Sequence, residues 1–285
     1  MILVTGATGN VGSALLRQLR AAGAGPVRAL TRDPERARAG GGIPYGVEAF
    51  GGDLARTESL GPALAGVRAL FLVSRVVPRA GADAEILAAA RAAGVEQVVL
   101  VSSITALTHP HLGPARENLA VERALKGSGM EWTILRPTQF ASNALLWADT
   151  VRVRGTVRVP YADTGLPTVH PADIASVARV ALTGPGHHGR TYELTGPAPV
   201  SARQQVGDIG AALGRDVPCV ETGRREAHRR LAAFFGNEAA DAVLDVTGGD
   251  VNDELLKVRD TVVRTTGAPA RTFRQWAEEN AAAFR

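Results

Sequence analysis

The amino-acid sequence predicts an α/β fold: a doubly wound parallel β-sheet with helices on both faces, followed by a smaller, mostly helical lobe. Three observations predict this class. A glycine-rich stretch follows the first apolar run, apolar runs alternate with helical segments as far as Pro137, and the alternation loosens beyond that residue. Continuous apolar runs are typical of parallel strands buried on both faces, which need helical crossovers between them.

The alternation can be followed element by element through the first half. Each expected strand is a short run rich in aliphatic residues, and each expected helix places its apolar residues at helical spacing. Strands are expected at residues 1–6, 26–32, 46–54, 68–74, 96–103 and 131–137, and helices at residues 10–23, 57–67, 81–95 and 114–129.

The second half is expected to be helical, with one clear strand. Helices are predicted at residues 170–184, 200–214, 224–236 and 272–284, and a strand at residues 190–196. We place the boundary between a sheet domain, residues 1–137, and a smaller substrate-binding lobe, residues 138–285, with some segments of the lobe returning to the main sheet.

Composition excludes several classes of function. The formal net charge is only +4 and the basic residues are scattered, so neither nucleic acid nor a membrane surface is expected as a partner. The lone Cys219 cannot form an internal disulfide, and no apolar run approaches the ~20 residues of a membrane helix. We expect a cytoplasmic monomer or homodimer.

The stretch "VTGATGNVGS" predicts a dinucleotide site, because it joins a strand to a helix. Gly6 permits the tight turn, Gly9 lets the backbone approach a pyrophosphate, and Gly12 lets the helix pack closely on the strand. The pyrophosphate is expected at the helix N-terminus, where free N–H groups favour negative charge. The residues expected to bind it are Thr5, Gly6, Thr8, Gly9, Asn10, Val11 and Gly12.

The end of the second strand favours NADPH over NADH. Many NAD sites have an acidic residue here, whereas Arg32 offers a planar donor fork that suits the 2′-phosphate of NADP. Asp33 follows, but it precedes Pro34 and suits a helix N-cap. The alternative for Arg32 is a solvated surface charge. We expect NADPH to be preferred and NADH to remain usable.

Further cofactor contacts are expected at the ends of the next two strands. Asp53 is a candidate for the adenine amine and Leu54 for covering the ring, although Asp53 also suits a simple turn. Val73 and Ser74 end the fourth strand, where the adenosine ribose or the pyrophosphate is expected.

With these motifs assembled, the chain resembles the NmrA-like group of atypical short-chain dehydrogenases/reductases. The resemblance covers the whole chain and rests on "VTGATGNVGS", "LTRDP", "GDL", "VLVSS", "ERALKGSGMEWTILRP", "HPADIA", "TYELTGP" and "TFRQWAEENAAAF". It implies a Rossmann core that binds NAD(P)H and reduces quinones, ketones, imines or activated double bonds. Some members of the group instead bind the dinucleotide and report redox state to a transcription factor.

The chain lacks the Tyr-x-x-x-Lys pair of standard members of the superfamily. In that pair the lysine lowers the pKa of a proton-donating tyrosine. None of the three tyrosines has a lysine four residues on, and Pro114 and Asn118 occupy the expected places. This departure argues against a tyrosine-driven epimerase or dehydratase. Hydride transfer to a quinone-like acceptor remains possible without this pair, because such a substrate stabilises its own oxyanion.

Candidate catalytic residues follow the fifth strand. Ser103 is expected to bond a substrate oxygen, and Ser102 the nicotinamide ribose, although both serines also suit a strand end. Thr105 and His109 follow in "ITALTHPHLG", where His109 or His111 is a candidate proton donor. No metal site is expected, because no cysteine or acidic ligand accompanies the histidines.

The end of the sixth strand is expected to shape the nicotinamide pocket. The resemblance assigns this role to Pro137 and the residues after it. We expect a mostly apolar substrate wall, although Leu146 and Trp147 equally suit a core; its candidates are Phe140, Asn143, Leu146, Trp147 and Tyr161.

Together these features predict an NADPH-dependent oxidoreductase, a ketoreductase or quinone reductase. The expected substrate is a ketone or quinone, including polycyclic aromatic, polyketide-like compounds. The alternative is a non-catalytic NAD(P)H redox sensor that binds a transcription regulator. An epimerase acting on a nucleotide sugar is a third, weaker alternative, because it would need the absent pair.

Overall fold

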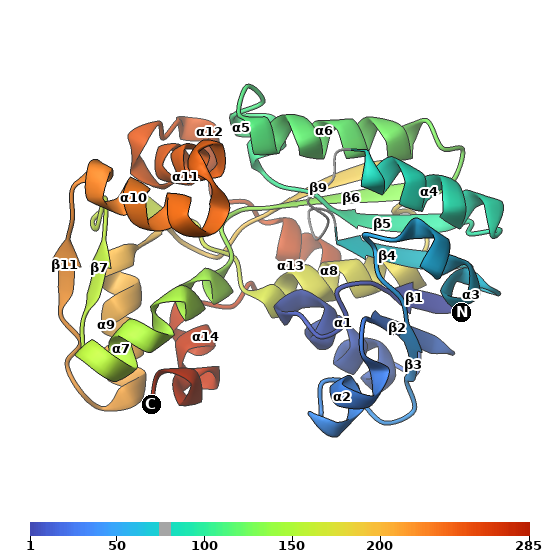
Figure 1. Ribbon diagram of the computed structural model, residues 1–285, viewed down its shortest axis with the longest axis horizontal. Helices are drawn as coiled ribbons and strands as arrows, with labels where there is room; N and C mark the ends of the chain where they lie inside the picture. Colours follow the sequence, from blue (N-terminus) through green and yellow to red (C-terminus); the bar gives the residue numbers. More distant parts are fainter. Residues whose placement is uncertain (74–80) are drawn as a thin grey trace. The chain divides into compact units, whose positions relative to one another are not determined.

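The computed structural model describes residues 1–73 and 81–285, which fall into two compact units. The sheet unit comprises Met1–Ala106, Arg116–Pro137 and Pro171–Glu193. The helical unit comprises Leu107–Ala115, Thr138–His170 and Leu194–Arg285. The elements of both units are labelled in Figure 1.

A seven-stranded sheet is the centre of the sheet unit, with strand order β3-β2-β1-β4-β5-β6-β9. The strands are β1 (Ile2–Val4), β2 (Val27–Thr31), β3 (Glu48–Gly51), β4 (Ala69–Val73), β5 (Gln97–Val101), β6 (Glu131–Pro137) and β9 (Arg190–Leu194). The strand pairs from β3 to β6 are all parallel, as in the register Ile2↔Val27 between β1 and β2. The predicted Rossmann-type α/β class is confirmed.

Helices cover both faces of this sheet (Figure 1). Helices α4 and α6 lie on one side, whereas α1 and α8 lie on the other and pack against each other. The helices of the unit are α1 (Asn10–Ala21), α2 (Pro34–Ala39), α3 (Gly61–Leu64) with the short 3-10 turn η1 (Thr57–Leu60) before it, α4 (Ala82–Ala92), α6 (Gly113–Lys126, whose first turn belongs to the helical unit) and α8 (Pro171–Thr183).

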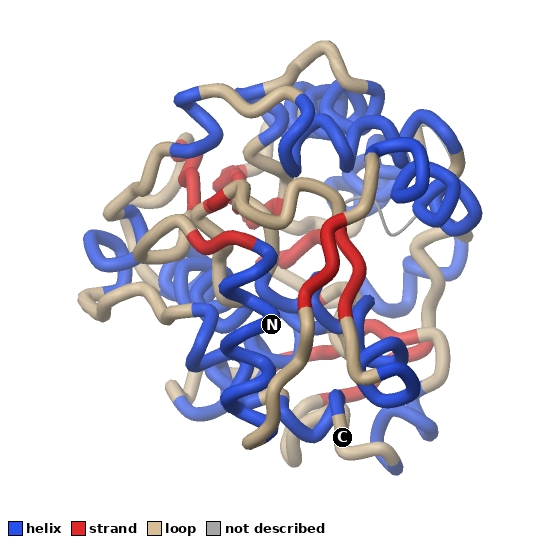
Figure 2. Tube along the Cα trace, turned by 90° about the vertical axis from the view of Figure 1, so that its left-hand side faces the viewer, coloured by secondary structure: helices blue, strands red, loops and turns tan. Residues whose placement is uncertain are grey.

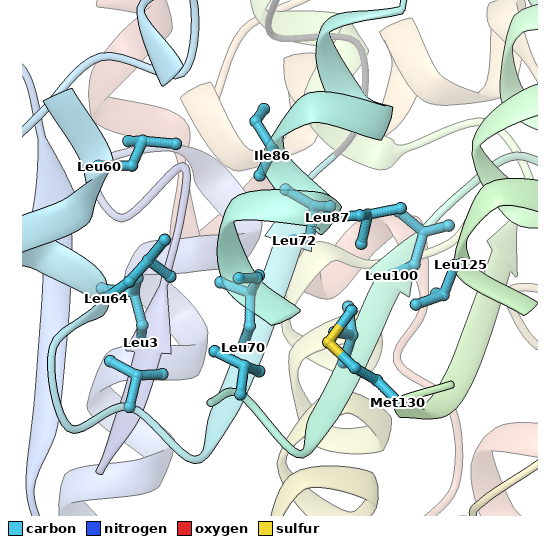
Figure 3. Close-up of a cluster of buried hydrophobic side chains, with 14 of the residues drawn as sticks. Leu3, Leu60, Leu64, Leu70, Leu72, Ile86, Leu87, Leu100, Leu125 and Met130 are labelled. Atoms are coloured by element: carbon cyan, nitrogen blue, oxygen red, sulfur yellow. The ribbon is translucent and has the colours of Figure 1, made fainter. Parts of the chain in front are cut away.

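The core of the sheet unit explains the continuous apolar strands. Side chains of β1, β4 and β5 meet those of α3, α4 and α6, and all are almost fully buried (Figure 3). Burial on both faces leaves no polar alternation to read in β4 or β5. The cluster includes Leu3, Leu64, Leu70, Leu72, Ile86, Leu87, Leu100 and Leu125.

The helical unit contains only short strands (red in Figure 2) besides its helices. Its core includes an aromatic cluster of Phe273, Trp276 and Phe284. Its elements are α5 (Thr105–Thr108, shared with the sheet unit), η2 (Ala141–Trp147), α7 (Ala148–Arg154), β7 (Val157–Val159), β8 (Gly165–Leu166), β10 (Val200–Ser201), α9 (Ala202–Leu213), β11 (Cys219–Glu221), α10 (Arg224–Phe235), α11 (Asn237–Leu244), the π-helical turn η3 (Asp245–Gly249), α12 (Asp253–Leu256), α13 (Thr261–Thr266), α14 (Phe273–Glu279) and η4 (Ala281–Phe284).

The division of the chain is more interleaved than a single boundary at Pro137. Residues Pro171–Glu193 belong to the sheet unit, since α8 packs on α1 and β9 joins the edge of the sheet. That residues 138–285 bind the substrate stays a prediction. Within residues 1–73 and 81–285, none of the helices is both long and apolar enough to cross a membrane.

Candidate active site

The glycine-rich loop lies at the carboxyl end of β1, where the strand order reverses between β1 and β4. Gly6 has φ +59°, and a Cβ atom at Gly12 would lie 2.1 Å from the Gly6 carbonyl oxygen. Only glycine at position 12 lets α1 approach the loop this closely. Dinucleotides bind at such a reversal point, so the position of the loop fits the predicted site.

The N-terminus of α1 is suited to an anion. Its N-cap, Gly9, provides no side-chain cap, and the first turn holds no acidic residue. The first N–H groups of a helix have no acceptor within the helix, and the helix dipole favours negative charge there. A pyrophosphate at this end would meet backbone donors and no opposing carboxylate of α1.

A cavity of about 690 Å³ lies beside this loop, wholly within the sheet unit. It is bounded by the glycine loop and by the ends of β2 and β3. Its lining residues are Gly6, Ala7, Thr8, Leu30, Thr31, Arg32, Asp33, Arg36, Ala37, Gly40, Gly42, Gly52, Asp53 and Leu54. Four of the predicted cofactor contacts outside the glycines therefore share one cavity: Thr8, Arg32, Asp53 and Leu54.

Two arginines line this cavity with their charges uncompensated. Arg32 and Arg36 are exposed, and neither guanidinium has a hydrogen-bond or ion-pair partner among the residues that the structure describes. Sequence reasoning missed Arg36, although its place four residues after Arg32 was a usable signal. Two free guanidinium groups, one directly after β2 and one on α2, suit a phosphate group.

The two aspartates near these arginines act within their own turns. Asp33 is the N-cap of α2, and its Oδ1 accepts a hydrogen bond from the Arg36 N–H at 3.0 Å, as expected. Asp53 Oδ1 accepts from the Ala55 N–H at 3.0 Å. This is the turn geometry weighed as the alternative for Asp53; its contact with adenine stays a prediction.

Thr5 joins the ends of β1 and β4. Its hydroxyl donates to the Phe71 carbonyl and accepts from the Val73 N–H, each at 3.0 Å, and its side chain is buried. The structure thus gives Thr5 a positioning role, and its direct contact with a dinucleotide stays a prediction. Val73 also lies beside the loop, because its Cγ2 would be 3.3 Å from a Cβ at Gly6. Ser74 lies outside the described residues.

Ser102 belongs to a buried polar network instead of facing a ligand. Its hydroxyl donates to Glu122 Oε1 at 2.7 Å, and Arg136 binds both oxygens of the same carboxylate at 2.9 and 2.6 Å. The network ties the ends of β5 and β6 to α6. The hydroxyl proton of Ser102 is engaged there, so its contact with the nicotinamide ribose stays a prediction without a free donor to support it.

Ser103 keeps its own proton available. Its Oγ accepts hydrogen bonds from the Thr105 hydroxyl at 2.9 Å and the Thr105 N–H at 3.2 Å. A serine hydroxyl has two acceptor lone pairs and one proton, so both acceptor positions are filled and the proton can be donated elsewhere. Thr105 thereby orients Ser103, whereas the notion that Thr105 itself reacts stays a prediction.

His109 is fully buried, although its place in a loop suggested a side chain that reaches the cleft or the surface. Its Nδ1 lies 2.8 Å from the Thr108 hydroxyl and its Nε2 lies 2.6 Å from the Asp250 carbonyl oxygen. Both ring nitrogens are occupied, so the structure assigns His109 to fixing the loop after α5 and gives no support to a proton donor. The exposed His111 packs near it, with ring centroids 6.0 Å apart.

The place of the absent lysine is held by a buried amide. Asn118 is 1% exposed, and its Nδ2 has no hydrogen-bond partner among the described residues. It lies one turn before Glu122 on the sheet-facing side of α6. The described residues hold no group of histidine, cysteine or acidic side chains that suits a metal ion.

The helical unit has a mostly apolar cavity of about 340 Å³. Four candidates for the substrate wall line it: Asn143, Leu146, Trp147 and Tyr161. Phe140 is not among the lining residues that the structure describes; its backbone pairs with Val169. The remaining lining residues include Gln139, Val159, Leu166, Gln205, Leu231, Phe235, Val243, Leu244 and Thr247.

A parallel sheet with a glycine loop at its reversal point, an uncapped helix N-terminus and free arginines defines a nucleotide-binding protein of the Rossmann class. The chain belongs to the NAD(P)H-binding family, which matches residues 6–185. The family and the NADP(H) cofactor are thus as predicted, and so is the NmrA-like resemblance.

Several relatives are reductases. The chain is 41% identical over 286 residues to the (4-alkanoyl-5-oxo-2,5-dihydrofuran-3-yl)methyl phosphate reductase of Streptomyces griseus, covering 100% of this chain and 99% of the relative. It is 35% identical over 286 residues to the NAD(P)H azoreductase of Xenophilus azovorans, with the same coverage.

Solved structures of similar fold are also reductases that bind NADPH or NADP(H). The NADPH-dependent quinone oxidoreductase of Escherichia coli, complexed with NADPH, matches with a TM-score of 0.80 and 27% identity over 98% of this chain and 99% of that chain. The triphenylmethane reductase of Citrobacter, complexed with NADP(H), matches with a TM-score of 0.77 and 25% identity, with the same coverage. The chain is an NAD(P)H-dependent oxidoreductase, as predicted. Its oligomeric state, location and lack of a nucleic-acid partner stay predictions.

Proposed function

We propose that this protein is an NADPH-dependent reductase of conjugated ketones and quinones, including polycyclic aromatic ones. The observation that carries the proposal is the apolar cavity of the helical unit, lined by Trp147, Tyr161 and Phe235, in a chain that uses NAD(P)H. Such a cavity favours a flat, apolar guest with a few polar atoms. The relatives named for quinones, azo compounds and triphenylmethane dyes support the same class of conjugated acceptor.

The residues of the sheet unit fit the cofactor. Gly12 allows the close approach that a pyrophosphate needs, the start of α1 supplies N–H donors, and Arg32 with Arg36 suits the 2′-phosphate. NADPH, when bound, supplies the hydride. The fold leads us to expect its adenosine half over β1–β3 and its nicotinamide half over β4–β6.

Ser103 is then the residue we assign to the substrate oxygen. It follows β5, and its free proton can be donated to a carbonyl or quinone oxygen as that oxygen gains negative charge. A conjugated acceptor spreads this charge over its own ring system. The chain therefore does not need the Tyr-x-x-x-Lys acid that it lacks.

The test is a turnover assay on the purified protein with NADPH and a panel of quinones, polycyclic ketones and azo dyes. We expect the absorbance of reduced nicotinamide to fall with at least one quinone or aromatic ketone. Tight NADPH binding without oxidation across the whole panel would contradict the proposal and favour the redox-sensor alternative. Turnover of azo dyes alone would contradict the choice of ketones and quinones.

A further inference from the structure

Tyr161, in the wall of the apolar cavity, has an unusual backbone. Its φ is +50°, and no other residue except glycine has a positive φ in the part of the chain that the structure describes. A large side chain rarely adopts this left-handed conformation, and it persists only where surrounding contacts impose it. Such residues cluster at functional sites, so the contacts that hold Tyr161 are informative.

The ring of Tyr161 packs against the backbone of η3 at Gly248. A Cβ atom at Gly248 would lie 2.2 Å from Tyr161 Cγ, so the ring is in direct contact with the bare backbone at that position. Any side chain at residue 248 would displace the ring. Gly248 therefore fixes the plane of the tyrosine that lines the cavity.

The hydroxyl of Tyr161 accepts a hydrogen bond from the guanidinium group of Arg224. Arg224 Nη1, on α10, donates to the Tyr161 oxygen at 3.3 Å and also lies 2.8 Å from Asp245 Oδ1. Arg224 Nη2 lies 3.3 Å from Asp241, which His228 also approaches at 3.5 Å. The hydrogen bond to Tyr161 and the Asp245 carboxylate hold the pKa of Arg224 above its usual value.

The bond from Arg224 fixes the Tyr161 hydroxyl and leaves its proton available for a further hydrogen bond. Its oxygen already accepts from Arg224, so its own proton can be donated to another acceptor. Arg224 shares a face of α10 with Leu231 and Phe235, both of which line the cavity. The phenol thus adds a polar group to a wall that is otherwise largely apolar.

We propose that the Tyr161 hydroxyl binds a second oxygen of the conjugated substrate, distinct from the oxygen that we assign to Ser103, with Arg224 as the residue that positions and polarises the hydroxyl. The inference rests on the proposed reductase function and adds the specificity contact. As hydride adds to a carbon conjugated with this oxygen and forms the new C–H bond, the displaced π electron pair moves through the conjugated system to the oxygen. A donor backed by a cation then binds this oxygen more strongly than the starting carbonyl.

The first test compares Tyr161→Phe with the wild type on the best quinone or ketone substrate. We expect kcat/KM to fall about 10- to 100-fold, the range for losing one hydrogen bond to a developing charge, with most of the loss in kcat. NADPH affinity should not change. Tyr192→Phe is the matched control, because Tyr192 bonds His187 within the sheet unit and should retain wild-type kinetics.

Four further variants test whether Arg224 and Gly248 position the Tyr161 hydroxyl or only stabilise the fold. Arg224→Met should lower kcat/KM as Tyr161→Phe does, and Arg224→Lys should restore part of it by returning the charge. The double variant with Tyr161→Phe should lose little more than either single variant, because both act through one hydrogen bond. Gly248→Ala should push the ring into the cavity and impair bulky substrates more than small ones.

The outcomes are distinguishable. Wild-type kinetics in Tyr161→Phe would overturn the inference and leave the reductase function intact. A wild-type protein that reduces no member of the panel would remove the reductase function itself. Equal losses of NADPH affinity, thermal stability and turnover in both Tyr161→Phe and Arg224→Met would make the pair structural and overturn the inference.

Discussion

Arg32 is the residue that we propose selects NADPH over NADH. It lines the cavity beside the glycine loop, and no described residue neutralises it. Arg32→Ala should weaken NADPH binding about 10- to 100-fold, because a charge-assisted hydrogen bond to phosphate is lost, and should leave NADH nearly unaffected. The measurement is the Kd of each dinucleotide by fluorescence titration.

The control for this prediction is Arg38→Ala. Arg38 is exposed on α2, the short helix that follows Arg32, but is not among the lining residues of the cavity. Its loss should change neither Kd by more than about twofold. Equal weakening of NADPH and NADH by Arg32→Ala would mean that Arg32 does not read the 2′-phosphate.

We propose that Ser103 acts in catalysis and not in cofactor binding. Because its proton is free while its lone pairs are held by Thr105, Ser103→Ala should lower kcat about 10- to 100-fold and leave the Kd for NADPH unchanged. Thr105→Val should give a smaller loss, since the Thr105 N–H still orients the serine. Steady-state kinetics with one quinone would check both variants, and an unchanged kcat in Ser103→Ala would remove the serine from the site.

At the scale of elements, the strands and long helices of the sheet unit followed from the sequence, because apolar runs and helical periodicity are local signals. The strand expected at residues 190–196 is β9, which joins the sheet edge. The strands β7, β8, β10 and β11 were missed because runs of two or three residues carry no period. The helices α5, α7, α11, α12 and α13 were missed as well.

The close packing of α1 on the glycine loop leads to a prediction about stability and NADPH binding. Gly12→Ala would bring a Cβ within 2.1 Å of the Gly6 carbonyl, so α1 must shift away from the loop. Thermal stability and NADPH affinity should both fall. Gly207→Ala is the matched control: Gly207 lies inside α9 with nothing within 4 Å of the added Cβ, so the change should stabilise by about 0.5–1 kcal/mol.

Thermal unfolding with and without NADPH would measure both changes. A Gly12→Ala variant as stable as the wild type, with unchanged NADPH affinity, would show that the close packing at this join is not required. Destabilisation by Gly207→Ala would show that an added methyl group is harmful in general and would make the Gly12 result uninformative about the loop.

At the scale of the whole molecule, the sequence was sufficient for the fold class, the dinucleotide loop and four lining residues of the apolar cavity, but not for the pairing of Tyr161 with Arg224. The loop is contiguous, whereas Tyr161 and Arg224 are 63 residues apart and meet only through packing within the helical unit. His109 also shows that contacts distant in sequence could not be predicted. Its sequence context suggested a loop side chain that reaches the cleft or the surface, but the side chain is buried and its partner Asp250 is 141 residues away.

The two-unit organisation leads to a prediction about ligand-linked stability. A ligand that binds only the folded state stabilises it by RT ln(1 + [L]/Kd), about 2.7 kcal/mol at a free concentration about 100 times Kd. The cavity beside the glycine loop, where we expect the adenosine half of NADPH, lies wholly within the sheet unit. If calorimetry resolves two unfolding transitions, NADPH should therefore raise the transition of the sheet unit by several degrees. Adenosine 2′,5′-bisphosphate should raise the same transition by less, because it lacks the nicotinamide half, and Arg32→Ala should reduce both shifts. If saturating NADPH moved no transition, the folded sheet unit would not be the NADPH-binding species, and the assignment of this cavity would be wrong.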